Sequence, residues 1–172
     1  MATFAELESA APPIAAFFGD RIAKTGLCLL ATTRSDGWPR VSPLELTIVD
    51  SRIYIGSMPN AVKAKDLQRD PRCCLITSLA NKDDLAGEVK AFCRAHEVVD
   101  TGEWEAVRAA FRELTGSDVV GEPGNAHLFE LDIESAAWQR VDGDRWLTTS
   151  WKAGAEIRER IRSGPTGASR DL

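Results

Sequence analysis

Alternation of apolar and polar residues with a period of two dominates the pattern along this chain. Phe129, Leu131 and Ile133 alternate with acidic residues, and in a strand such neighbours point to opposite faces of the sheet. Residues 40–49 alternate in the same way, and short apolar runs bounded by turn residues occur elsewhere. The pattern predicts strands at residues 27–33, 40–49, 52–57, 72–79 and 88–99, followed by a final hairpin whose second arm is residues 145–151.

Three other segments carry the marks of helices. Residues 14–24 follow Pro12-Pro13 and hold apolar residues on one stripe, at Ile14, Phe17, Phe18 and Ile22. A second helix is predicted to begin at the N-cap Asn60 and to stop at Asp70, because the residue before a proline is pushed out of the α region.

The third predicted helix begins with the capping-box pattern Asp100-Thr101-Gly102-Glu103. Apolar residues then recur at helical spacing, at Trp104, Val107, Phe111 and Leu114. Antiparallel strands joined by hairpin turns, with three short helices at the connections, predict a mainly β fold with helical inserts (α+β), and specifically a small barrel.

Composition agrees with one soluble domain. The chain has 172 residues, of which 44% are hydrophobic and 27% charged, enough to build a single core without disulfide or metal support. We expect one domain over residues 1–163 and a disordered tail over residues 164–172, which are rich in Gly, Ser and charge. No signal peptide pattern and no apolar run long enough to span a membrane is visible.

The charge and the cysteines narrow the partners and the compartment. A net charge of −5 and a pI near 5.1 argue against nucleic acid or an anionic membrane as a partner. The cysteines are expected to be buried reduced thiols in strands, since none forms a C-x-x-C motif and Cys73 and Cys74 should point to opposite faces. These features predict a cytoplasmic protein without a metal site.

Two lysines in the opening turns of the second predicted helix are the first candidates for chemistry. Lys63 and Lys65 lie where the helix dipole disfavours cations. A bound phosphate would remove that conflict, because the free N–H groups of the first turn and the two ammonium groups could converge on it. The alternative is a solvated helix face on which Asp66 neutralises Lys63.

Other polar residues precede this helix by one hairpin. Arg40 and Ser42 share the parity of the apolar residues on their strand, so an unbroken strand would aim both toward the core side, where a guanidinium requires an anion. Together with Ser57, Lys63 and Lys65 they could surround one phosphate. The alternative is that Arg40 lies at the start of the strand and turns into solvent, or pairs with an acidic neighbour such as Asp36.

The remaining candidates are weaker. His96 and His127 are expected to be structural or surface residues, and Cys93 should face away from His96. Nucleophile-elbow, P-loop and Rossmann glycine motifs do not occur. The last hairpin contains the tryptophans Trp138, Trp146 and Trp151. They either stack on a planar ring or belong to the core or to a subunit interface. The neighbouring Arg145 is either a contact to a ring or an anion, or a surface charge.

The order of these features resembles a known family. Gly37-Trp38-Pro39-Arg40-Val41-Ser42-Pro43, Ile53-Tyr54-Ile55-Gly56-Ser57 and the lysine-bearing helix ending in Asp70-Pro71-Arg72 are similar to the pyridoxamine 5'-phosphate oxidase-like flavin-binding split β-barrels. The resemblance covers residues 14–100 well. It implies a six-stranded antiparallel split β-barrel that forms a homodimer, with flavin bound between the subunits.

The resemblance also implies a role for each candidate residue. Arg40 and Ser42 would lie near the flavin phosphate and ribityl chain, with Val41 as a backbone contact between them. Ser57 would be a contact on the next strand, Lys63 would grip the phosphate, and Lys65 would be a second basic position. The chain departs from the flavin-phosphate oxidases at Val62, where an arginine is common, and it lacks their C-terminal substrate-binding pattern.

We therefore expect an FMN-dependent oxidoreductase that transfers hydride through the flavin to a small-molecule substrate. No protein acid or base is evident, as is expected when the chemistry belongs to the cofactor. One alternative is a reductase that uses the deazaflavin coenzyme F-420, which a basic groove including Arg69 or Arg72 would favour. The other is a non-catalytic flavin- or haem-binding protein, with His96 or His127 as the axial ligand of haem.

Overall fold

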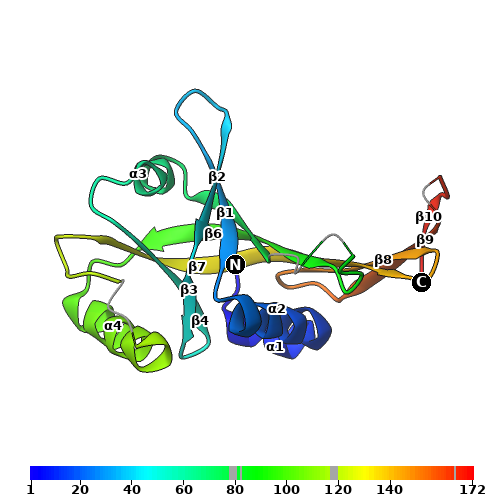
Figure 1. Ribbon diagram of the computed structural model, residues 1–172, viewed down its shortest axis with the longest axis horizontal. Helices are drawn as coiled ribbons and strands as arrows, with labels where there is room; N and C mark the ends of the chain where they lie inside the picture. The colour runs from blue at the N-terminus through cyan, green and yellow to red at the C-terminus, as the bar shows by residue number, and fades with distance from the viewer. Residues whose placement is uncertain (78–80, 82, 117–119, 165) are drawn as a thin grey trace.

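A long twisted antiparallel sheet organises the molecule (Figure 1). The structure is a computed structural model, and it describes residues 1–77, 81, 83–116, 120–164 and 166–172, without the side chains of Leu114 and Thr115. Eight strands lie in the order β10-β9-β8-β7-β6-β5-β1-β2, and β3 and β4 join through the pairing of β4 with β7. The sheet does not close, so the predicted mainly β, split-barrel class is confirmed, with ten strands among the described residues rather than six.

The predicted elements occur in the predicted order, and the structure adds α1, β9 and β10 to them. The strands are β1 (Cys28–Thr33), β2 (Pro39–Leu44), β3 (Leu46–Val49), β4 (Arg52–Ser57), β5 (Arg72–Thr77), β6 (Glu88–Glu97), β7 (His127–Asp142), β8 (Arg145–Lys152), β9 (Arg158–Ser163) and β10 (Ser169–Asp171). The helices are α1 (Phe4–Ala10), α2 (Pro12–Thr25), α3 (Val62–Arg69) and α4 (Thr101–Thr115). The predicted strand end at residues 78–79 lies outside the described residues, and residues 164–172 include the short strand β10, which pairs with β9.

One predicted strand was wrong in detail, and one helix was missed. The strand expected over residues 40–49 is broken at Glu45, because β2 pairs with β1 whereas β3 pairs with β4. The helix α1 was not predicted, although Thr3 and Glu6 form a capping box at its start. Its Phe4 and Leu7 are buried against the sheet, so tertiary packing supports a helix too short to be stable alone.

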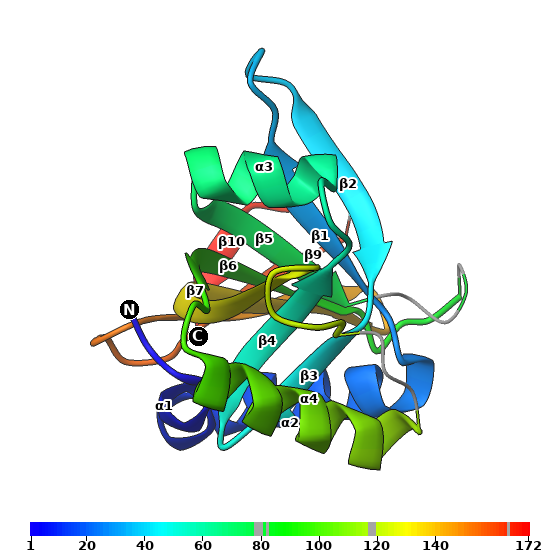
Figure 2. The same cartoon turned by 90° about the vertical axis from the view of Figure 1, so that its left-hand side faces the viewer.

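The helices cover the sheet in separate places. In Figure 1, α1, α2 and α4 lie on one side, and α3 and the β1–β2 hairpin lie on the other. The main core joins α1 and α2 to the strands through residues such as Phe18, Leu30 and Ile133. A second cluster fixes α4 against β4, and it includes Tyr54 and Trp104. Figure 2 shows α3 and α4 on opposite sides of β4.

The long strand β7 connects the two halves of the molecule. Its first half pairs with β4, from His127↔Ser57 to Leu131↔Ile53. Its second half pairs with β8, and β6 runs along its other edge. His127 therefore lies between β4 and β6. It is opposite Ser57, the last residue of β4, from which the chain continues to α3.

Candidate functional site

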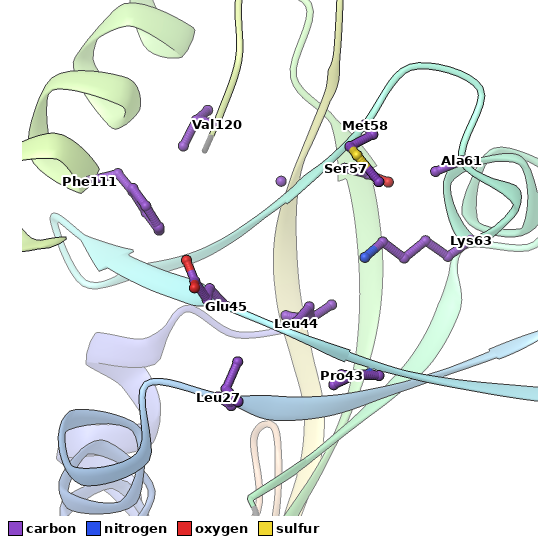
Figure 3. Close-up of a pocket in the computed structure, with 11 residues that line it drawn as sticks. Leu27, Pro43, Leu44, Glu45, Ser57, Met58, Ala61, Lys63, Phe111 and Val120 are labelled. Atoms are coloured by element: carbon purple, nitrogen blue, oxygen red, sulfur yellow. The ribbon is translucent and has the colours of Figure 1, made fainter. Parts of the chain in front are cut away.

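A cavity of about 390 Å³ opens beside the start of α3 (Figure 3). Residues from β2, β4, α3 and α4 and their connections line it: Leu27, Pro43, Leu44, Glu45, Gly56, Ser57, Met58, Ala61, Lys63, Phe111 and Val120. Most of the wall is apolar, whereas Ser57, Lys63 and Glu45 bring polar groups. The cavity therefore combines an apolar surface with a few polar groups, as small-molecule sites do.

Lys63 is the cationic group of this cavity. Figure 3 shows its side chain reaching from α3 toward the space below Ser57. Burial raises the pKa of Cys28 to about 12, and the nearby Lys63 ammonium opposes that shift. Among the described residues, no acidic side chain forms an ion pair with Lys63, and the first turn of α3 contains no acidic residue.

The start of α3 differs by one residue from the prediction. Ala61 is the N-cap and makes no side-chain cap, whereas Asn60 adopts a left-handed backbone conformation with φ of 61°, which asparagine tolerates better than most residues. Lys63 is thus the second helical residue. No side chain caps the first-turn N–H groups, which α-helices leave without partners inside the helix.

Asp66 points away from Lys63 and into the protein, which rules out its role as the neutraliser of Lys63. Its carboxylate is 3% exposed and accepts hydrogen bonds from Arg40 Nε at 2.6 Å and Thr32 Oγ1 at 3.0 Å. Arg69 approaches it at 3.4 Å. Burial raises the pKa of Asp66, but the hydrogen bonds from Arg40 and Thr32 outweigh it, and the pKa is lowered overall.

Arg40 therefore pairs with Asp66, whereas the sequence suggested a bound phosphate or a neighbour such as Asp36. Asp36, the alternative considered from the sequence, binds Arg34 at 2.8 Å instead. Arg40 is half-buried on β2 on the same face as Ser42 and Leu44, and Leu44 reaches the cavity. A row of alternate residues on β2 thus runs from the Asp66 carboxylate to the cavity.

Ser57 lies at the end of β4 and is 8% exposed. Its hydroxyl oxygen is buried and has no hydrogen-bond partner among the described residues. A buried hydroxyl without a partner is costly and uncommon. An anion in the cavity would satisfy both this hydroxyl and the Lys63 ammonium.

The structure does not bring all the predicted residues to the cavity. Lys65 is exposed, and two helical steps place it on the far side of α3 from Lys63. Val41 faces away from Arg40 and Ser42 and is 58% exposed. Glu45 and Phe111, which line the cavity, were not predicted, because only the folded chain brings α4 beside the break between β2 and β3.

The histidines and cysteines lie elsewhere. His96 Nε2 is 3.1 Å from Asp132 Oδ2, and Cys93 is buried on the opposite face, as predicted. Cys73 is buried and Cys74 partly buried, on opposite faces of β5, and all four cysteines are free thiols. Within the described part of the chain, no three His, Cys, Asp or Glu side chains group to hold a metal ion.

The tryptophans of the last hairpin do not line the cavity. Trp151 is buried, and Trp138 stacks on Phe17 with ring centres 4.7 Å apart. Trp146 is 46% exposed and Arg145 binds Asp142 at 2.8 Å. None of the helices in the described residues is both long and apolar enough to cross a membrane.

Comparison with known proteins places these features in a family context. The family model for pyridoxamine 5'-phosphate oxidase matches residues 16–140, from α2 to the second half of β7. Among proteins with curated annotation, no sequence matches. The match ends before β8, so strands β8 to β10 lie beyond it.

Solved structures share the fold at low sequence identity. ChuZ from Campylobacter jejuni is 12% identical with a TM-score of 0.69, covering 91% of this chain and 65% of that one, so the chain spans less than two thirds of ChuZ. HutZ, a haem storage protein from Vibrio cholerae, is 22% identical with a TM-score of 0.59, covering 73% of this chain and 90% of that one. An F420 reductase is 12% identical with a TM-score of 0.51, covering 64% and 87%.

Proposed function

This chain belongs to the pyridoxamine 5'-phosphate oxidase family, and from that premise we propose that it is an FMN-dependent oxidoreductase that binds the cofactor phosphate at the start of α3 and works as a homodimer. The observation that carries the proposal is the pair of unpartnered polar groups in the cavity, the Lys63 ammonium and the buried Ser57 hydroxyl. When bound, the flavin would supply hydride transfer.

The residues present fit a phosphate group. Lys63 offers a positive charge and Ser57 a hydroxyl donor. The first turn of α3 offers the N–H groups of Val62 and Lys63, which precede those bonded to the Ala61 carbonyl, and the positive end of the helix dipole. Arg40 keeps its Nε on Asp66 and, like Ser42, does not line the cavity, so its part in the proposal is to hold α3 through Asp66. The apolar wall, with Leu44 and Phe111, would exclude water from the rest of the ligand.

The surroundings of α3 favour FMN over the deazaflavin coenzyme F-420. The acidic tail of that coenzyme calls for a basic groove beyond the phosphate site, for which Arg69 and Arg72 were the candidates. Arg69 binds Asp66 and the carbonyl of Thr33, and Arg72 holds Asp70 with two hydrogen bonds. Arg72 is thus paired with a carboxylate of its own, whereas Arg69 shares the Asp66 carboxylate with Arg40 and is held there and at the Thr33 carbonyl, so neither side chain is left to extend along a ligand tail.

Haem is less favoured than flavin because it needs an axial ligand. Neither His96 nor His127 lines the cavity beside Lys63. A haem storage protein does share the fold, so absorption of the protein mixed with haemin tests this alternative. The FMN proposal expects no shifted Soret band.

The two lysines provide a matched test of cofactor binding. We expect Lys63→Ala to weaken FMN binding by about 10- to 100-fold, because a hydrogen bond to a charged group contributes about 1.5–3 kcal/mol. Lys65→Ala removes the same charge from the exposed side of α3 and should change the Kd by about twofold or less. Fluorescence titration with FMN and with F-420 in parallel measures both. Tighter binding of F-420 would refute FMN as the cofactor. Equal losses of affinity in the two variants would refute the proposed site.

Support for a homodimer comes from an uncovered apolar area on the sheet. We call this the apolar band: it consists of two rows of cross-strand neighbours on the sheet face opposite the main core, Val41–Ala31–Cys74–Phe92 and Pro43–Leu29–Ile76. Val41 and Phe92 are 58% and 49% exposed. Contiguous exposed apolar surface of this kind marks interaction sites, and a two-fold axis would place the band of one copy on that of the other.

A further inference from the structure

The unpartnered hydroxyl of Ser57 lies directly opposite a histidine. In the β4–β7 ladder, Ser57 is the partner of His127. Directly opposite residues of an antiparallel pair point to the same face, with Cβ atoms about 4.5–5.5 Å apart. Ser57 therefore has a titratable side chain beside it in the protein and the cavity on its other side.

His127 is oriented by a carboxylate on the neighbouring strand. Its Nδ1 lies 2.7 Å from Glu97 Oε1, and Gln68 Nε2 from α3 holds the two oxygens of Glu97 at 3.2 and 2.9 Å. Burial raises the pKa of Glu97, but hydrogen bonds from Gln68 and His127 outweigh it, and the pKa is lowered overall. An ionised Glu97 can only accept, so His127 donates from Nδ1 and leaves Nε2 for another partner.

The three residues connect the cavity with a second opening. β7 lies between β6 and β4, so His127 stands between the strand of Glu97 and that of Ser57. Glu97 lines a separate cavity of about 390 Å³ on the other side, together with Leu67, Gln68, Pro71, Ala95, His96 and Phe129. His127 itself is 22% exposed at its side chain. His127 lines neither cavity, so we expect it to exchange protons with solvent through this exposed part of its side chain.

We propose that Ser57, His127 and Glu97 form a proton relay to the ligand bound beside Lys63, an inference that rests on the proposed function. In the relay, Ser57 Oγ–H gives its proton to the ligand as the imidazolium Nε2–H of His127 gives its own to Ser57 Oγ. Ser57 ends as a neutral hydroxyl, His127 ends neutral, and a proton from solvent restores the imidazolium. Ser57 is the group that touches the ligand, and His127 and Glu97 are positioning residues.

The charges around the relay are suited to this role. β6 presents Glu97, whose carboxylate accepts a hydrogen bond from His127 Nδ1, and α3 presents Lys63 beyond Ser57 at the ligand. Asp66 on α3 is engaged by Arg40 and Thr32 and is not available to His127. β4 contributes only the uncharged hydroxyl. In the absence of a ligand the Ser57–His127 hydrogen bond is not formed, as is common for groups that align only in the complex.

NMR of the imidazole nitrogens tests the relay without any cofactor. Sulfate is the anion probe, because it does not titrate near neutral pH, and it is added to the full-length protein at constant pH. We expect the His127 Nε2 resonance to shift as sulfate binds, in step with the Nζ resonance of Lys63. The shift should be lost in Ser57→Ala and retained in Ser57→Thr, which keeps the hydroxyl. His96, which pairs with Asp132, serves as the internal control and should not respond.

Each result decides a separate question. If Lys63 responds to sulfate and His127 does not, the relay is wrong and the anion site stands. If neither responds, the anion site is wrong and the relay fails with it. A His127 shift that persists in Ser57→Ala would mean coupling through space and would overturn the relay. Should Ser57→Ala not fold, Glu97→Gln replaces it, because a neutral amide holds the Nδ1–H of His127 more weakly than a carboxylate and should reduce the response. An unchanged response in Glu97→Gln would overturn the relay.

Discussion

Asp66→Asn should lower the free energy of unfolding by about 2–3 kcal/mol. Breaking a buried ion pair by removing one partner costs about 3–5 kcal/mol when the remaining charge is fully buried. The Arg40 side chain is 28% exposed, so water relieves part of that cost. Asp66 joins β1, β2 and α3 through Thr32, Arg40 and Arg69, and its loss should also loosen the helix that carries Lys63.

Urea unfolding measures this effect, and the chain offers a matched control. Asp36→Asn removes a carboxylate from the exposed pair with Arg34, whose side chains are about half exposed, and should cost about 0.5 kcal/mol or less. The double variant Arg40→Met/Asp66→Asn should recover part of the loss, because the half-buried Arg40 guanidinium is no longer left without its carboxylate. Equal losses from Asp66→Asn and Asp36→Asn would show that the buried cluster has no special role.

The same carboxylate makes stability depend on pH. The pKa of Asp66 is lowered in the folded protein, so its contribution is present above the ordinary carboxyl range, near pH 4, and is lost as pH falls below it. Asp70 adds to this trend, since the hydrogen bonds from Arg72 lower its pKa to about 2. The difference in the free energy of unfolding between wild type and Asp66→Asn should therefore be smaller at about pH 3 than at neutral pH.

The order of the elements from α2 to β8 could be predicted from local patterns, apart from the division of β2 from β3. The alternation at Phe129, Leu131 and Ile133 predicted a strand because all three face one core. The proline after Asp70 predicted the end of α3. The break at Glu45 could not be predicted in this way. Its neighbours keep the alternation, and only the choice of pairing partner, β1 or β4, separates β2 from β3.

The site was predicted in part for the same reason. Lys63 was identified by its unfavourable place near a helix start, a local feature. The partner of Arg40 could not be identified, because Asp66 is 26 residues away and its direction depends on how α3 packs over β1. The relation of Ser57 to His127 also depends on a strand register across 70 residues of chain. No spacing rule connects such positions.

Phe92→Asp should convert a dimeric wild-type protein into a folded monomer. Phe92 is 49% exposed in the apolar band, next to Cys74 on the neighbouring strand. A two-fold interface would bury the substitution twice, and each unpaired carboxylate costs several kcal/mol when it is removed from water. The free monomer keeps the new carboxylate in solvent, so its circular dichroism should match that of wild type.

Sedimentation equilibrium and FMN titration, carried out on the same samples, test the interface together with its link to the cofactor. Because the family resemblance implies flavin sites between subunits, the monomer formed by Phe92→Asp should also lose FMN affinity although Lys63 and Ser57 are intact. Val99→Asp is the control: Val99 is 88% exposed outside the apolar band, and this variant should remain dimeric and bind FMN as wild type does. A monomeric wild type, or a Phe92→Asp variant that stays dimeric, would contradict the interface. A monomeric Phe92→Asp variant with unchanged FMN affinity would instead place the whole site within one chain, where the cavity beside Lys63 would have to hold the cofactor without a partner.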